Sequence, residues 1–424
     1  MKKIIAVMAL VVGYLGLTYY AGIIAEQNIR QQVALTQQQS TSKQLQLQIR
    51  EYDRGWFRSR VVLRATQPEA EVDEAVELIA RARLWHGPLT FAQGIKPGWF
   101  YASGEIELAE TSAGQNARLR KVVGDRLGAM NLWGKLSGAY QFSWDIPAIE
   151  YREPEGSVKV AASKWLSEGR FDSRDGVHQL AMGEAALTSG RTSVSLSPLT
   201  IRAEVEFIAD DIPLTQVHTQ VERAEIRTGV NMALEGIDYR QSQRAREQVV
   251  DTQVDIRIQS LQSFVALSQI QIQAAAEGTS FEAIRNATRL TEQWQTDSAA
   301  LPSDEQIMAL IKPLLHDSTR VTWLAHASAD KGEIHSEMEL TYASNPQFPL
   351  DALVLDDLPQ VIAAQAELRV GEKIVQRSPL MFLMADYIER YTQHRNGAYV
   401  VPANYDKGIL RINNQPVSWD ELGW

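Results

Sequence analysis

Residues 199–207 read Leu-Thr-Ile-Arg-Ala-Glu-Val-Glu-Phe, and their strict alternation decides the fold class. Side chains of a β-strand point to opposite faces in turn, so this stretch has one apolar face and one polar face. The same period of two returns at 253–259, 269–273 and 333–340. Strands with one dry face are typical of antiparallel sheets, whereas buried parallel strands are apolar on both faces. The pattern predicts antiparallel strands and disfavours a doubly wound α/β domain.

A hairpin is predicted closer to the N-terminus. Apolar and polar residues alternate over 45–49, the turn formers Asp53-Arg54-Gly55 follow, and a second strand contains Val62-Leu63. Residues 75–85 are compatible with a strand or with a helix. Apolar side chains at every second position favour the strand.

Two helices are predicted late in the chain from their start signals. Thr279 with Glu282, and Ser303 with Gln306, form capping-box patterns ahead of apolar stripes. Pro313 is expected to kink or shorten the second helix, because proline removes a backbone donor.

A third helix is predicted between Ser378-Pro379 and Asn396-Gly397, since proline favours the first helical turn and glycine follows the last. Its apolar stripe supplies a candidate ligand or partner face, formed by Leu380, Leu383, Met384, Tyr387 and Ile388. Methionine adapts to irregular apolar surfaces, which include lipid and variable partners. Packing of this stripe on the protein's own sheet is the alternative.

An uncharged apolar segment, Ile4 to Ala25, follows Lys2 and Lys3. As a helix its 22 residues span about 33 Å, which is enough for a hydrocarbon core of about 30 Å. Bulky Ile23 stands where a signal-peptide cleavage site needs a small side chain, so the segment is expected to stay attached. The lysines should remain cytoplasmic. The sequence predicts a single transmembrane helix with the remaining chain on the far side of the membrane.

These elements predict an α+β fold that is predominantly antiparallel β. A single N-terminal transmembrane helix is followed by a large curved one-sided sheet body with a few late amphipathic helices. The expected domains are an anchor at 1–25, a polar stalk at 26–43 and a β-rich body at 44–424. The body is either one domain or two sub-domains that meet near 275–300.

Composition and motifs exclude several functions. The 424-residue chain has a net charge of −10, which disfavours nucleic-acid binding, and it has no cysteine for disulfides, thiolate metal sites or nucleophiles. Zinc-binding histidine spacings and the Gly-x-Ser-x-Gly elbow are missing, so no catalytic residue, metal ligand or cofactor is predicted. His86, ahead of Gly87-Pro88, is predicted to occupy a special turn; an acid/base role is the alternative.

Four segments together carry a family resemblance. They are the N-terminal apolar segment, Tyr52-Asp53-Arg54-Gly55-Trp56-Phe57, His86-Gly87-Pro88-Leu89, and a closing hairpin at 408–416 that turns at Asn413-Asn414. The chain resembles the YdgA-like family of bacterial envelope proteins, a domain of unknown function. The resemblance implies an inner-membrane anchor, a β-rich periplasmic body and no established activity.

The sequence favours a membrane-anchored periplasmic protein that binds rather than catalyses. The expected location is the bacterial inner membrane, crossed once, with the body in the periplasm. The expected partners are the inner membrane itself and a cargo of lipid, lipid-linked molecule or envelope protein, in envelope maintenance. Two alternatives stay open: an envelope hydrolase with a site near His86, and a self-associating structural scaffold. An open apolar groove would favour binding, and a polar cleft at His86 would favour hydrolysis.

Overall fold

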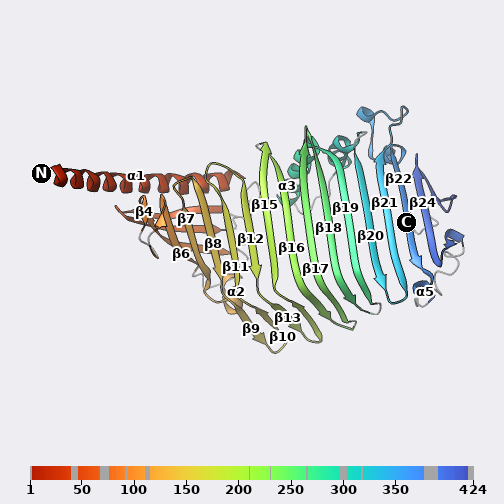
Figure 1. Cartoon of the computed structure of the whole chain (residues 1–424), viewed down its shortest axis with the longest axis horizontal. Helices are drawn as coiled ribbons and strands as arrows, with labels where there is room; N and C mark the ends of the chain where they lie inside the picture. The colour runs from red at the N-terminus through yellow and green to blue at the C-terminus, as the bar shows by residue number, and fades with distance from the viewer. Residues whose placement is uncertain are drawn as a thin grey trace. The chain divides into compact units, whose positions relative to one another are not determined.

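The computed structural model shows a protein built mainly of β-strands (Figure 1). Strands hold 62% of the residues and helices 18%. The structure describes residues 2–39, 46–66, 76–90, 94, 96–109, 115–209, 211–229, 231–263, 266–296, 303–316, 319–376 and 390–418. The chain divides into two compact units, Met1–Glu206 and Phe207–Trp424, and each is described by itself.

Unit 1 is an antiparallel sheet with a long helix, α1 (Lys2–Gln39), packed on its first strands. The pairing order is β1–β2–β3–β6–β7–β8–β11–β12–β15. A second ladder runs β9–β10–β13–β14, and β4 pairs with β5. The bounds are β1 Gln46–Arg54, β2 Arg58–Thr66, β3 Glu77–His86, β4 Leu89–Thr90, β5 Lys96–Pro97, β6 Phe100–Leu108, α2 Gln115–Val123, β7 Arg126–Gly134, β8 Ala139–Ile146, β9 Ile149–Glu153, β10 Gly156–Val160, β11 Ser163–Arg170, β12 Gly176–Met182, β13 Ala185–Ser189, β14 Thr192–Leu196 and β15 Leu199–Ala209.

Small side chains bring α1 close to the sheet of unit 1. Thr18, Ala21 and Ala25 are almost completely buried, and their spacing of three to four residues places them on one side of the helix. Ala25 joins a core cluster that includes Leu84 and Phe100 from the strands. The helix is therefore part of the core of unit 1 along this side.

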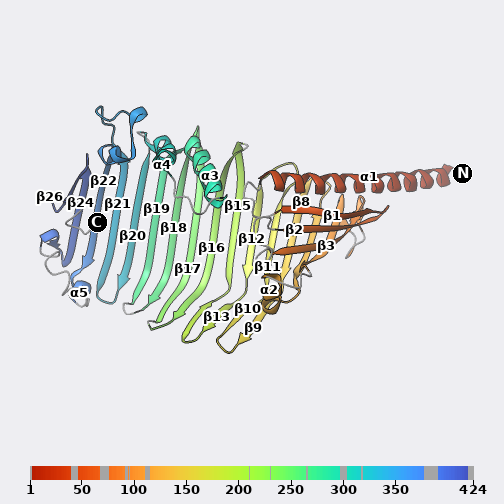
Figure 2. The ribbon, with the colours of Figure 1, turned by 180° about the vertical axis from the view of Figure 1, so that it is seen from behind.

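The prediction of a transmembrane helix at 1–25 is wrong. Among the helices of the described residues, none is long and apolar enough to cross a membrane. The physical reason lies in α1, where the second half of the apolar segment packs from Thr18 to Ala25 against the protein's own strands. Figure 2 shows that the N-terminal part of α1 extends past β1–β3. Hydropathy alone did not distinguish lipid from protein as the partner of this segment.

Unit 2 is also an antiparallel sheet, with strands of up to 16 residues. The pairing order is β16–β17–β18–β19–β20–β21–β22–β24–β25–β26, and β23 pairs with β24. The strands are β16 Ile212–Arg227, β17 Asn231–Arg246, β18 Val249–Gln262, β19 Leu267–Ser280, β20 Arg320–Ala329, β21 Gly332–Tyr342, β22 Ile362–Gly371, β23 Gln393–Arg395, β24 Ala398–Asp406, β25 Ile409–Ile412 and β26 Gln415–Val417. The helical elements are α3 Phe281–Thr296, α4 Asp304–Ile311, η1 Lys312–Leu314, η2 Leu350–Ala352, η3 Leu355–Gln360 and α5 Glu372–Val375.

The α+β class is wrong because strands hold 62% of the residues and helices only 18%. The strand predictions themselves are confirmed. The alternating segments all form antiparallel strands, and residues 75–85 fall largely in β3. The N-terminal hairpin is β1–β2, and the closing hairpin turns at Asn413-Asn414, where both residues have positive φ. Apart from α1 and the 16-residue α3, the described helices have nine residues or fewer. Helices therefore make up a small part of a mainly-β protein. The expected stalk at 26–43 and the break near 275–300 stay predictions.

The helix predictions are confirmed in part. Ser303 and Gln306 make both bonds of the capping box of α4, and Pro313 follows α4 in the 3₁₀ turn η1. The cap of α3 is one residue later than predicted, since Ser280 Oγ accepts the bond from the backbone N–H of Ala283 at 3.1 Å.

Asn396-Gly397 does not end a helix. Both residues have positive φ and join β23 to β24, which is the geometry of a tight hairpin turn. Both a helix end and such a hairpin use left-handed backbone, so the dipeptide alone did not separate them. The predicted helix over Leu380 to Ile388 lies outside the described residues.

Candidate functional site

The sheet of unit 2 has two chemically different faces. Directly opposite residues of an antiparallel pair point to the same face, so the register assigns each side chain. Ile256 is opposite Tyr239 and Ile272, whereas Asp255 is opposite Arg240 and Gln273. We call the side that carries Ile256 the apolar face and the side that carries Asp255 the polar face.

A groove with a volume of about 810 Å³ crosses the strands from β17 to β24. Two parallel rows of its lining residues belong to the polar face: Arg240, Asp255, Gln273, Leu324, Glu337, Glu367 and Pro402 in one row, and Ser242, Gln253, Ala275, Thr322, Glu339, Gln365 and Asn404 in the other. The remaining lining residues lie between the two rows in sequence, so their backbone forms the floor. The groove carries more acidic than basic side chains.

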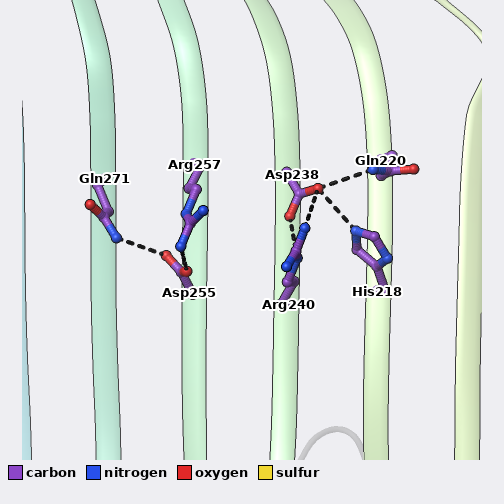
Figure 3. A network of polar contacts seen from close by, with 7 residues as sticks. All are labelled: His218, Gln220, Asp238, Arg240, Asp255, Arg257 and Gln271. Atoms are coloured by element: carbon purple, nitrogen blue, oxygen red, sulfur yellow. Dashed lines mark hydrogen bonds and ion pairs between the residues drawn. The ribbon is translucent and has the colours of Figure 1, made fainter.

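Charged side chains on the polar face pair along their own strands. Arg240 Nε lies 2.8 Å from Asp238 Oδ1, and Arg257 Nη2 lies 2.7 Å from Asp255 Oδ2 (Figure 3). Gln271 adds a cross-strand bond to Asp255 at 3.4 Å. Residues two apart in a strand share a face, which brings each arginine to its acid. These exposed arginines neutralise much of the negative charge of the face.

Asp238 has the most strongly bonded carboxyl of this network. Its Oδ2 lies 2.9 Å from His218 Nε2 and accepts a bond from Gln220 Nε2 at 3.1 Å (Figure 3). Partial burial raises the pKa of the Asp238 carboxyl, but the bonds from its three partners outweigh burial and hold that pKa well below its ordinary value. Such a carboxyl stays ionised near neutral pH and is a poor proton donor. The network is suited to holding the ionised Asp238 carboxylate at a fixed position on the polar face.

The apolar face extends over seven strands, β17 to β22 and β24. Two of its rows are Gln241, Val254, Ala274, Trp323, Met338, Ala366 and Ala403; and Tyr239, Ile256, Ile272, Ala325, Ser336, Leu368 and Val401. A third row is interrupted by a register shift between β19 and β20, with Ile237, Ile258 and Ile270 on one side of the shift and Ala327, Ile334, Val370 and Tyr399 on the other. Trp323 and Met338 are opposite each other and each is 38% exposed, and Leu368 is 40% exposed. A sheet normally buries its apolar face against another layer. These three side chains leave the middle of the apolar face open to solvent, whereas Ala327 in the third row is buried.

His86 is buried between α1 and the sheet of unit 1. Ser59 Oγ donates to His86 Nε2 at 3.1 Å, and His86 Nδ1 donates to the backbone carbonyl of Thr18 at 3.3 Å. This polarity follows because a carbonyl oxygen only accepts, which places the ring proton on Nδ1. A Cβ added to Gly22 would lie 2.8 Å from the ring. Burial, foremost, lowers the pKa of His86. The imidazole therefore holds α1 in place as a neutral group.

We expect the contribution of His86 to the free energy of unfolding to decrease as the pH is lowered. Its pKa is lowered on folding, so the stability is complete above the unfolded pKa of about 6.5 and is lost as pH falls toward the folded value. His86→Asn removes this linkage, so the stability gap between wild type and variant should narrow on acidification. Urea unfolding from about pH 8 to about pH 5 measures the gap. His335→Asn, which replaces a partly exposed ring of unit 2, is the control. If the difference in free energy of unfolding between wild type and His86→Asn stays constant with pH, the linkage is contradicted.

The sequence indicated only part of this arrangement. The five residues of the predicted ligand face, Leu380, Leu383, Met384, Tyr387 and Ile388, lie outside the described residues. The groove was missed because its rows come from seven strands that only the register aligns. One signal was present in the sequence: oppositely charged residues two apart within a strand, as in Asp238/Arg240, Asp255/Arg257 and Glu367/Arg369.

Comparison with known proteins gives one match. A family model described as "Bacterial protein of unknown function (DUF945)" matches residues 1–420. Neither a curated protein nor a solved structure matches the chain. Any function must therefore be argued from the geometry of the molecule.

Proposed function

We propose that this chain, which belongs to the DUF945 family of bacterial proteins of unknown function, binds the acyl chains of a lipid or lipid-linked molecule on the apolar face of unit 2. The proposed role is binding, without a reaction. The resemblance to YdgA-like envelope proteins supports a place for this role in the bacterial envelope, with the body in the periplasm.

The size and exposure of the apolar face carry the proposal. Seven strands at a spacing of ~4.8 Å, and three rows two residues apart, give a surface of about 29 Å by about 14 Å. This footprint of about 400 Å² is within the size range of the largest apolar patch on a typical monomer, which is often functional. One leaflet contributes about 15 Å of a bilayer's hydrocarbon core, so several acyl chains fit side by side along the strands.

The relief of the apolar face favours flexible chains over a flat protein partner. Trp323 and Met338 form a ridge across β20 and β21, and alanines stand beside it: Ala274 on β19 and Ala366 on β22. Each alanine leaves a depression about one strand wide, ~4.8 Å, beside this ridge. Methionine adjusts its shape to a bound chain at small cost.

Neighbouring residues of β20 supply a matched test. Trp323 and Leu324 are 38% and 36% exposed but point to opposite faces. We expect Trp323→Gln combined with Met338→Gln to weaken binding of a fluorescent fatty acid by tenfold or more, because each side chain gives about 1.5–3 kcal/mol when buried. Leu324→Gln should leave binding unchanged. Lipid that co-purifies with the full chain, measured by mass spectrometry, should follow the same order.

Two results would speak against binding on the apolar face. Equal loss in the two sets of variants would show that the polar face or general unfolding is responsible, which melting curves distinguish. A wild-type chain that carries no lipid and binds no fatty acid would overturn the proposal.

A further inference from the structure

Large apolar side chains gather on the surface of unit 1 where α1 passes the first hairpin. Tyr19 of α1 is 41% exposed, and Trp56 and Phe57 of the β1–β2 turn are 60% and 50% exposed. Tyr19, Trp56 and Phe57 come from two segments far apart in sequence, and we call these three residues the aromatic collar.

Close contacts connect α1, the hairpin and the neighbouring strands. The rings of Tyr19 and Trp56 lie 5.4 Å apart. Tyr14 Oη donates to the carbonyl of Leu89 at 3.0 Å, and the backbone N–H of His86 donates to the carbonyl of Phe57 at 3.0 Å. The collar is thus tied to the same helix–sheet contact that buries His86.

The hairpin turn holds its aromatic residues outward. Gly55 N donates to the carbonyl of Arg58 at 3.0 Å, and a Cβ on Gly55 would lie 2.7 Å from that oxygen, so the turn is tight. A tight turn of this kind presents Trp56 and Phe57 at its tip. Removing the apolar surface of tryptophan and phenylalanine from water is favourable, so their exposed position points to an apolar partner.

The charge around the collar is basic although the protein is acidic. Between residues 50 and 60 lie four arginines and two acidic residues, in a chain of net charge −10. Glu26 of α1 pairs with one of these arginines, Arg54, at 3.2 Å, and with Arg30 at 2.9 Å. Arg54 also stacks over the Tyr19 ring, with its guanidinium carbon 5.4 Å from the ring centre. Aromatic side chains beside arginine are typical of surfaces that bind at the level of lipid headgroups.

We propose that the aromatic collar docks unit 1 on the interfacial region of a bilayer that carries anionic headgroups. Two observations select a membrane over a protein partner. The first is that the basic charge complements anionic lipid. The second is that the collar lies beside the N-terminal stretch of α1. This helix is uncharged from Ile4 to Ala25, and its N-terminal part extends past β1–β3 (Figure 2). The contact is interfacial, with aromatic rings at headgroup depth. It involves unit 1 and does not depend on the function proposed for unit 2.

Vesicle co-sedimentation of the full chain tests this surface. The probes are vesicles of phosphatidylcholine with phosphatidylglycerol in equal parts, and vesicles of phosphatidylcholine alone. Trp56→Ser combined with Phe57→Ser should reduce affinity for the mixed vesicles at least tenfold, because two large apolar side chains no longer enter the interface. Wild type should prefer the mixed vesicles, and the preference should shrink as salt is raised.

Two controls keep the result specific. Leu187→Ser combined with Val194→Ser removes another pair of exposed apolar neighbours of unit 1, and should bind vesicles like wild type. Trp323→Gln, on the apolar face of unit 2, should also bind like wild type, so failure of the lipid-binding proposal leaves this one standing. Equal vesicle binding by wild type and the Trp56/Phe57 variant would overturn the proposal. So would a wild type that sediments equally with both vesicles.

Discussion

Gly22→Leu is expected to displace α1 from the sheet and to lower the free energy of unfolding of unit 1 by about 3 kcal/mol. A Cβ at this position would lie 2.8 Å and 2.9 Å from His86 ring atoms. The ring is buried and hydrogen-bonded on both nitrogens, so it has little room to yield. Leucine gains about 1 kcal/mol of helix propensity over glycine, which is too little to offset the overlap. Thermal melting and proteolysis of α1 measure the effect.

The same helix supplies the control. A Cβ at Gly16 would meet nothing within 4 Å, so Gly16→Leu should be neutral or slightly stabilising. Gly22→Ala should be partly rescued by His86→Ala, because the methyl group then enters the space left by the ring. We expect a coupling of about 0.5–3 kcal/mol between these two changes. Independent, additive effects of the pair would contradict the packing described for α1.

Gly128→Ala is expected to disrupt the pairing of β7 with β8. Gly128 has a φ of +139°, and an added Cβ would lie 2.2 Å from the carbonyl oxygen of Asp145 and 2.6 Å from Trp144 Nε1. Backbone of a central strand cannot move aside without breaking its ladder. The loss should therefore exceed about 3 kcal/mol, the sum of left-handed strain and overlap. Chemical unfolding of the variant provides the measurement.

Gly190→Ala isolates the two contributions. Gly190 also has a positive φ, +56°, but a Cβ there would meet nothing within 4 Å. This change should cost only the conformational strain, about 1–2 kcal/mol. Similar losses for the two variants would show that close backbone approach at β7–β8 contributes little.

Strands were the part of the fold that local pattern could predict. Alternation is a property of consecutive residues, so Leu199 to Phe207 showed one-sidedness without knowledge of any partner strand. The turns at Asp53-Arg54-Gly55 and Asn413-Asn414 were also readable, because turn geometry depends on a few adjacent residues. The class label failed because helix start signals say little about how much of the chain the helices occupy.

The N-terminal helix shows what hydropathy leaves out. A membrane core and a protein core both accept apolar side chains, so Ile4 to Ala25 alone did not select between them. The informative signal was finer: Thr18, Ala21, Gly22 and Ala25 place small side chains on one side of the helix, which permits close approach to a packed neighbour. His86 was recognised as unusual, but its partners Ser59 and Thr18 are distant in sequence and only the fold reveals them.

The candidate sites depended on register rather than on motif. Trp323 and Leu324 are adjacent in sequence, and a one-residue slip of β20 would exchange their faces. Trp56 and Phe57 were noted within a short motif, but their exposure in the β1–β2 turn is known only from the fold. Sequence patterns thus indicated that the strands have two kinds of face, and left open which side chains face a ligand.

The sequential pairing of strands in unit 2 has a consequence for how this unit folds and how it is degraded. From β16 to β22 each strand bonds to the next in the chain, so most native contacts close short loops. Low contact order favours rapid folding, and nearest-neighbour stabilisation resembles that of repeat proteins. Such a sheet can open one strand at a time from a free edge without collapse of the remainder. Proteolytic turnover of unit 2 would then begin at β25 and β26, at its C-terminal end.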